Sequence, residues 1–268
     1  MKISAYISAG LVSLSLLGCT TNPITGRKSF QLTSLNPEIQ ASSFSQYRAT
    51  LNKSKVINNT SAARQVKAVG QRIRNAAHAY YRSIGREQDL ASYAWEFNLI
   101  EDKQVNAWCM PGGKVAVYTG ILPVTKNETG MAVVMGHEIA HALAGHGNER
   151  ISQAMVAQYG GAILGSAISD AQWARVFQEA YPLGSQMVLL KYGRSQELEA
   201  DEIGLYLMAM AGYDPRQALP FWERMEAQSS GQRNPEFLST HPHPESRRAD
   251  ITRHLPRALN YYKQAGGK

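Results

Sequence analysis

The stretch GHEIAH at residues 136–141 decides both the fold and the chemistry that the sequence predicts. Apolar residues at 131–134 precede it, and Asn127 stands where a helix cap is expected, so the spacing predicts a helix. Residues four positions apart share one face of a helix, so His137 and His141 point the same way. Their imidazole nitrogens can hold one metal ion, and zinc binds such nitrogens at about 2.0–2.1 Å.

Glu138 follows the first histidine of this pair and is rotated by about 100° around the helix axis. Its carboxylate therefore lies beside the metal, where it can take a proton from a bound water. The HExxH pattern is typical of zinc hydrolases for this reason. A chance match on a core helix is the alternative, and the helical context disfavours it.

The third zinc ligand is not part of the same helix. A catalytic zinc usually has three protein ligands and one open position. The metzincin pattern is absent, because Ala144 and Gly147 stand where its glycine and third histidine would be. His146 lies five residues beyond His141, on another side of the helix, so we expect a surface residue or one behind a ligand.

The stretch SQELEAD at residues 195–201 offers the missing ligand. Glu197 and Asp201 share one helix face, whereas Glu199 points about 200° away from Glu197. One of the two carboxylates can bind zinc while the other accepts the free N–H of a ligating histidine. The residues alone leave these two roles exchangeable, and a solvated acidic helix face is the alternative for the stretch by itself.

GHEIAH followed about sixty residues later by QELEAD resembles metallopeptidase family forty-eight, a family of gluzincins. Residues 106–122 also resemble the segment that precedes the active-site helix in that family, and the similarity covers about residues 65 to 255. The resemblance implies that Glu197 is the third zinc ligand and that Asp201 is the second carboxylate. The chain lacks strong transmembrane helices and therefore resembles the lipoprotein members.

The stretch STHPHPES at residues 239–246 matches a further part of the family pattern. The resemblance selects His241 rather than His243 and implies a displaceable fourth zinc ligand that plugs the site, or a residue that assists catalysis. It also implies that Arg247 is an active-site arginine, and either residue would stabilise the oxyanion. A stiff turn before the last helix, with an idle histidine, is the alternative.

The N-terminus has the pattern of an export signal, with Lys2 before an apolar run and Gly18 before Cys19. Its ending LLGC resembles a bacterial lipobox, which implies a signal peptide over residues 1–18 and a lipid on Cys19. Thr20 at the next position implies the periplasmic face of the outer membrane in a bacterial cell envelope.

The expected domains follow from this signal: a lipidated tether over residues 19–35 and a metallopeptidase domain over residues 36–268. The chain has two cysteines. If Cys19 carries a lipid, Cys109 has no partner, which excludes a disulfide framework and favours a small buried side chain.

The rest of the sequence predicts an α+β fold, mostly helical, with one small β-sheet beside the helix that carries GHEIAH. Nearly all of the chain after Pro123 is expected to be helical, and its apolar stretch at 154–168 is shorter than a membrane span. The earlier elements are expected as helices from Asn36 and over 61–84, a short strand at 29–33, strands over 93–100 and 115–119, and a turn at 111–113.

These observations predict a zinc-dependent endopeptidase with one zinc ion per chain, which cleaves unfolded or misassembled envelope proteins. The substrate is expected to pair as a strand with the edge near Lys114–Thr119, and the lipid anchor would bind the membrane. The alternative is an outer-membrane assembly or chaperone-like factor with latent peptidase activity, which would contact the assembly machinery. The net charge is +7, without basic clusters interleaved with aromatics, so no nucleic acid is expected as a partner.

Overall fold

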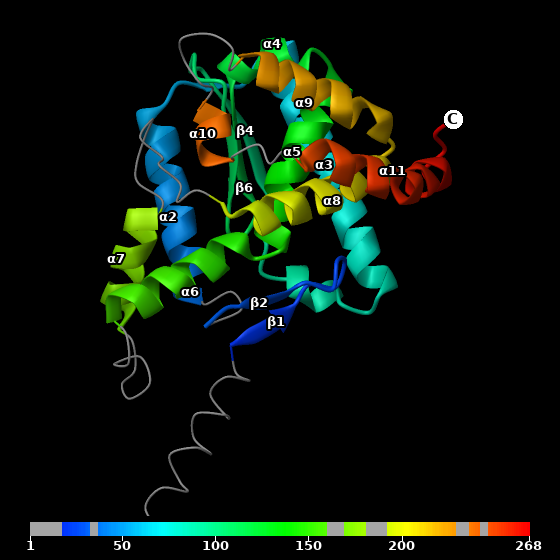
Figure 1. Cartoon of the computed structure of the whole chain (residues 1–268). Helices are drawn as coiled ribbons and strands as arrows, with labels where there is room; N and C mark the ends of the chain where they lie inside the picture. Colours follow the sequence, from blue (N-terminus) through cyan, green and yellow to red (C-terminus); the bar gives the residue numbers. More distant parts are fainter. Residues whose placement is uncertain (1–17, 33–36, 160–168, 181–191, 229–235, 242–245) are drawn as a thin grey trace, which may run out of the picture.

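The computed structural model describes residues 18–32, 37–159, 169–180, 192–228, 236–241 and 246–268. The described part is mostly helical, with a small four-stranded sheet beside the central helix α5 and a separate two-stranded hairpin, so the predicted α+β class is confirmed (Figure 1). The elements, in chain order, are β1 (Cys19–Thr21), β2 (Lys28–Phe30), α2 (Pro37–Lys53), β3 (Val56–Ile57), α3 (Ser61–Ser83), η1 (Glu87–Leu90), β4 (Glu96–Ile100), β5 (Ala107–Met110), β6 (Lys114–Tyr118), η2 (Thr119–Ile121), α4 (Leu122–Thr125), α5 (Glu128–Leu143), α6 (His146–Tyr159), α7 (Asp170–Ala180), α8 (Arg194–Met210), η5 (Pro215–Gln217), α9 (Ala218–Ala227), α10 (Glu236–Thr240) and α11 (Arg247–Gln264).

The larger sheet has the strand order β3-β4-β6-β5, with β4 and β6 parallel and the other pairs antiparallel. β6 is therefore hydrogen-bonded on both sides, so the prediction of a free edge near Lys114–Thr119 is wrong. The edge strands are β3 and β5, and the sequence predicted neither of them. All four residues of β5 are buried, so its sequence AWCM lacks the alternation by which a half-buried strand is recognised.

The tight connection between β5 and β6 depends on two glycines, as the predicted turn requires. Gly112 and Gly113 have φ angles of 82° and 86°, which favour residues without a Cβ. A Cβ at Gly113 would lie 2.6 Å from the Trp95 ring. The turn therefore allows β5 to return directly alongside β6.

The expected helices form where the sequence places their caps and apolar faces. Asn127 caps α5, since its side-chain oxygen accepts from the N–H of Gly130 at 3.0 Å. Thr60 caps α3 by accepting from the N–H of Ala63 at 3.1 Å. The predicted apolar face of α3 is buried; its members are Val66, Val69, Ile73 and Ala77.

α5 and α8 approach each other at the level of the backbone. A Cβ built on Gly136 would lie 3.0 Å from the carbonyl oxygen of Gly204, and one on Gly204 would lie 2.8 Å from the amide nitrogen of His137. Only glycines fit this crossing. The close approach brings the carboxylates near the start of α8 to the histidines of α5.

The N-terminal segment lies against the domain. β1 and β2 form an antiparallel hairpin beside α6 (Figure 1). The side-chain amide of Gln31 donates to the carbonyl of Ala144 at 3.4 Å, and the N–H of Leu32 donates to the hydroxyl of Ser152 at 3.0 Å. The expected tether is thus docked at these residues, while the expected signal sequence lies outside the described residues except for Gly18.

None of the helices in the described ranges has both the length and the apolar content that a membrane span needs. The apolar stretch at 154–168 is helical as far as Tyr159. Its remainder falls outside the described residues.

Candidate metal centre

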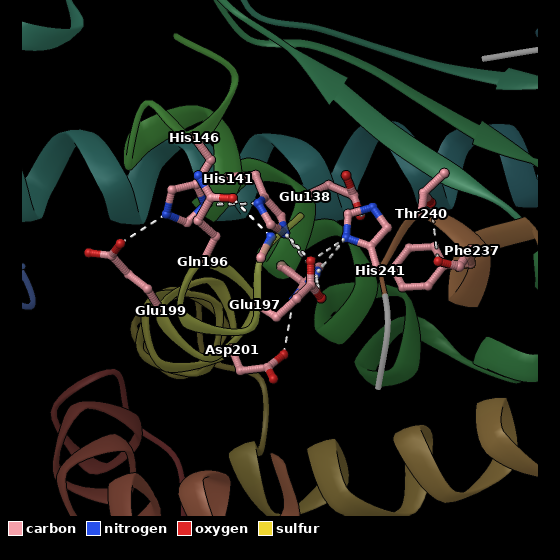
Figure 2. A network of polar contacts seen from close by, with 12 residues as sticks. Glu138, His141, His146, Gln196, Glu197, Glu199, Asp201, Phe237, Thr240 and His241 are labelled. Carbon is pink, nitrogen blue, oxygen red and sulfur yellow. Dashed lines mark hydrogen bonds and ion pairs between the residues drawn. The ribbon is translucent and has the colours of Figure 1, made fainter. Parts of the chain in front are cut away.

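Four buried side chains from three parts of the chain meet at one point beside α5. His137 and His141 come from α5, Glu197 comes from the first turn of α8, and His241 follows α10. One ligand atom of each lies within 4.8 Å of the others. In Figure 2, Glu197 from α8 and His241 from the end of α10 both point toward His141.

The four atoms have the spacing of a tetrahedral zinc site. Nε2 of His137 lies 3.0 Å from Nε2 of His141 and 3.3 Å from Nδ1 of His241. The Oε1 atom of Glu197 lies 3.1 Å from Nδ1 of His241 and 3.5 Å from Nε2 of His141. Bonds of about 2.0–2.1 Å in a tetrahedron place neighbouring ligand atoms about 3.3 Å apart. Four of the six separations lie close to this value and all six lie within 4.8 Å, so the residues fit one zinc ion.

The charges of the cluster also favour a cation. Burial works to raise the pKa of Glu197, but His241 and His137 hold it well below its usual range. Burial works to lower the pKa of His137, but Asp201 and Glu197 raise it to about 9. Burial and the neighbouring His137 lower the pKa of His141. An ionised carboxylate and a neutral imidazole are the forms that bind zinc, so Glu197 and His141 already have these forms, whereas His137 must release a proton.

Glu138 lies beside the ligand set and is not one of its four members. Its Oε1 atom lies 3.4 Å from Nε2 of His241 and has no hydrogen-bond partner among the described residues. The backbone N–H of Cys109 in β5 contacts its carboxylate. Burial raises the pKa of Glu138, which brings the carboxylate closer to a proton acceptor that works near neutral pH.

The structure separates the two carboxylates that the sequence left exchangeable. Glu197 contributes the oxygen in the ligand set, whereas Asp201 accepts from Nδ1 of His137 at 2.9 Å. Arg247 is fully buried and donates to both, with Nε at 2.5 Å from Asp201 and Nη2 at 2.7 Å from Glu197. Its guanidinium lies 3.9 Å from the centre of the Trp222 ring.

A second hydrogen-bonded branch leaves the metal centre from His141, and the sequence did not assign it. Nδ1 of His146 lies 2.8 Å from Nδ1 of His141, and Nε2 of His146 lies 2.9 Å from Glu199 (Figure 2). Of the two expectations for His146, the surface position is wrong, because its side chain is fully buried. Five-residue spacing would place His141 and His146 on different sides of a continuous helix. The contact forms because the helix breaks at Gly145, which has a φ of 67°.

Tyr192 is a further residue that the sequence did not indicate. Its ring stacks on His141 with 3.9 Å between centres, and its backbone N–H donates to the carbonyl of Thr240 at 3.2 Å. It stands two positions before the start of α8, in a stretch without a motif. His243, the histidine that the resemblance does not select, lies outside the described residues.

Comparison with known proteins decides the family. Residues 63–254 match Peptidase family M48. The chain belongs to this family. Membership confirms the predictions of a metallopeptidase and of zinc as its cofactor, and the buried ligand set agrees with both.

The chain is similar to longer proteins of the same family. It is 39% identical over 171 residues to the mitochondrial metalloendopeptidase OMA1 of Schizosaccharomyces pombe, covering 63% of this chain and 49% of that protein. Human metalloendopeptidase OMA1 is 34% identical over 177 residues, covering 62% and 33%. The Escherichia coli beta-barrel assembly-enhancing protease is 32% identical over 187 residues, covering 64% and 37%. The matches thus span between a third and a half of these relatives.

The prediction of a bacterial outer-membrane location is wrong, because the relatives include mitochondrial proteins of fungi, a plant and animals. The location was inferred from Thr20 and the short signal before it. A single positive charge before an apolar run indicates an apolar N-terminal segment. The same pattern says little about the membrane to which the protein is directed.

Proposed function

We propose that the protein is a zinc endopeptidase of unfolded or misassembled polypeptides. His137, His141 and Glu197 would hold the zinc ion, and Glu138 would act as the general base. The observation that carries this proposal is the tetrahedral spacing of buried ligand atoms, with a buried carboxylate next to them. The chain covers only part of its relatives, so its activity is inferred from the site.

The proposed mechanism assigns a task to each polar side chain. Bound zinc would polarise the scissile carbonyl and a water molecule. Glu138 takes the proton of the attacking water on its carboxylate and gives it to the leaving amine. Asp201 holds the proton of His137 on Nδ1 and so keeps Nε2 available for the metal. Arg247 orients Glu197 and Asp201, because its guanidinium already donates to both.

His241 is proposed to keep the site closed at rest. Nδ1 of His241 belongs to the ligand set, and Nε2 faces the carboxylate of Glu138 at 3.4 Å. One ring would therefore occupy the open position of zinc and also contact the general base. Both must become free before a substrate carbonyl can reach the metal.

The substrate is proposed to be an extended chain that pairs with the outer edge of β5. This edge runs beside the site, since the N–H of Cys109 contacts Glu138. Two residues before the strand begins, the carbonyl of Val105 accepts from the N–H of Phe237 in α10 at 3.2 Å. A substrate strand would displace α10, and movement of α10 would carry His241 away. Pairing through the backbone favours unfolded polypeptides, because it reads little side-chain sequence.

The deciding experiment is Glu138→Gln, assayed with zinc content and with cleavage of an unfolded casein-type protein. We expect the variant to keep one zinc per chain and to lose about 10²–10⁴-fold in cleavage rate, the usual contribution of a general base. Glu128→Gln, in the exposed first turn of the same helix, is the matched control. Wild-type cleavage by Glu138→Gln would refute the proposed role.

His241→Ala tests the closed state. We expect faster cleavage of the unfolded protein than by the wild type, because both the metal and Glu138 become accessible. His243→Ala, the neighbouring histidine, is the control. A slower variant would instead indicate that His241 stabilises the transition state.

A closed site also supports a second function, that of an assembly or chaperone-like factor whose peptidase activity is latent. One relative is named a beta-barrel assembly-enhancing protease. The two functions differ in what Glu138→Gln does in a cell that lacks the wild-type gene. Full rescue of the deletion phenotype would favour binding, whereas no rescue would favour cleavage.

Lipid attachment at Cys19 stays a prediction. Cys19 is exposed and opens β1. The intact mass of the protein purified from its own host would show the added lipid, and Cys19→Ala would remove it.

A further inference from the structure

His146 forms a bridge between a zinc ligand and a carboxylate of α8. Its ring is fully buried, with Nδ1 at 2.8 Å from Nδ1 of His141 and Nε2 at 2.9 Å from Oε2 of Glu199 (Figure 2). When Nε2 of His141 faces the metal, these two hydrogen bonds allow only one placement of the protons on the two rings. Nδ1–H of His141 donates to His146, and Nε2–H of His146 donates to the carboxylate.

The outer end of this bridge is held by the turn between β1 and β2. Nε of Arg27 and the hydroxyl of Thr25 both donate to Glu199. The two terminal nitrogens of Arg27 donate to Glu149 of α6 at 3.1 Å and 2.7 Å. Gln196 of α8 donates to the same Glu149 at 2.8 Å. One arginine thus joins α6, α8 and the N-terminal hairpin.

The same hairpin also contacts the backbone that places His146. The side-chain amide of Gln31 donates to the carbonyl of Ala144, just before the left-handed Gly145. This contact lies at the break between α5 and α6. The break lets the ring of His146 return toward His141.

We propose that His146 is a positioning residue for the zinc site, and that the β1–β2 turn sets its position through Arg27. His146 fixes the ring plane and the tautomer of His141, as second-shell acceptors do for other metal-bound histidines. Movement of the N-terminal hairpin would therefore change the affinity of the metal centre. This inference rests on the proposed zinc site, and it adds residues that the GHEIAH and QELEAD motifs do not contain.

The first test compares His146→Leu, which keeps a buried side chain but accepts no hydrogen bond, with His146→Asn, whose side-chain oxygen can accept in place of Nδ1. Zinc affinity is measured by competition with a chelator, and the ligand geometry by the visible absorption of the cobalt-substituted protein. We expect His146→Leu to bind zinc about 10–100-fold more weakly and to shift the cobalt bands. His146→Asn should recover part of both.

The second test removes the outer clamp. Arg27→Gln should weaken zinc binding by a few-fold at most, because Glu199 keeps its bonds to His146 and Thr25. Lys28→Gln makes the same charge change at the next residue, which is exposed in β2, and should bind zinc as the wild type does.

The outcomes separate this inference from the proposed function. A wild-type protein that binds no zinc would overturn both. A wild type that binds zinc, with folded His146→Leu showing unchanged affinity and unchanged cobalt bands, would overturn the positioning role alone. If His146→Leu does not fold, Arg27→Gln decides: unchanged cobalt bands would overturn the positioning role, and shifted bands would support it.

Discussion

His137 and His141 lie one turn apart on the same helix, yet their outward nitrogens are held in different ways. Nδ1 of His137 contacts the carboxylate of Asp201 directly, whereas Nδ1 of His141 reaches Glu199 through His146. Both carboxylates belong to α8. The same helix therefore orients two metal ligands, one through a single hydrogen bond and one through two.

The two branches also end at different depths. Asp201 is paired with Arg247, which has no exposed side-chain surface, while Glu199 is paired with Arg27, whose side chain is 22% exposed. A fully buried pair cannot be broken without a large loss of stability. A branch that ends in a partly exposed hairpin can be altered from outside the core. The difference suggests a fixed ligand at His137 and an adjustable one at His141.

The largest effect is expected from Asp201→Asn, which breaks the direct branch. Loss of the charge leaves buried Arg247 with one carboxylate, and removing a partner of a buried pair costs about 3–5 kcal/mol. Zinc affinity should also fall about 10–100-fold. Urea unfolding and chelator competition measure the two effects.

Asp214→Asn provides the control for this prediction, because it breaks the exposed pair with Arg216. An exposed pair contributes less than about 1 kcal/mol. Equal loss of stability in the two variants would contradict the distinction between the buried branch and the surface.

The next effect is the pH dependence of zinc binding. Without zinc, the pKa of His137 is raised to about 9, so its imidazole holds a proton at neutral pH that zinc must displace. The pKa of His141 is lowered, so it releases none. From these two residues, apparent zinc affinity should fall about tenfold per pH unit below 9 and level off above it. Chelator competition at several pH values measures the slope.

Asp201→Asn sharpens this comparison, since removal of its carboxylate lowers the pKa of His137. The slope should then become shallower between pH 7 and 9. Calorimetry in buffers of different ionisation enthalpy counts the released protons. A wild type that releases no proton at pH 7 would show that the two histidines do not differ.

The smallest effect is expected from Glu199→Gln, which weakens the indirect branch at its far end. The amide oxygen can still accept from His146, so zinc affinity should fall about threefold, less than the 10–100-fold typical of direct partners of a ligand. Glu202→Gln on the same helix, whose partner is His254, is the control. A loss as large as that of Asp201→Asn would show that both branches contribute equally.

The sequence by itself determined the parts of the site that one helix can place. Four-residue spacing put His137 and His141 on one face of α5, and the same spacing paired Glu197 with Asp201 on α8. The cap at Asn127 and the apolar face of α3 followed from local side-chain chemistry. These features depend on residues within one or two helical turns of each other, so their spacing can be read directly from the sequence.

Tertiary structure alone decided which residues of different helices and strands come into contact. The Gly136–Gly204 crossing of α5 and α8 brings the two helices together, and Glu197 rather than Asp201 then lies in the candidate ligand set. The edge strand β5 could not be recognised, because burial on both faces removes alternation. The branch through His146 to Arg27 joins residues more than 100 positions apart, and no local spacing encodes such a contact.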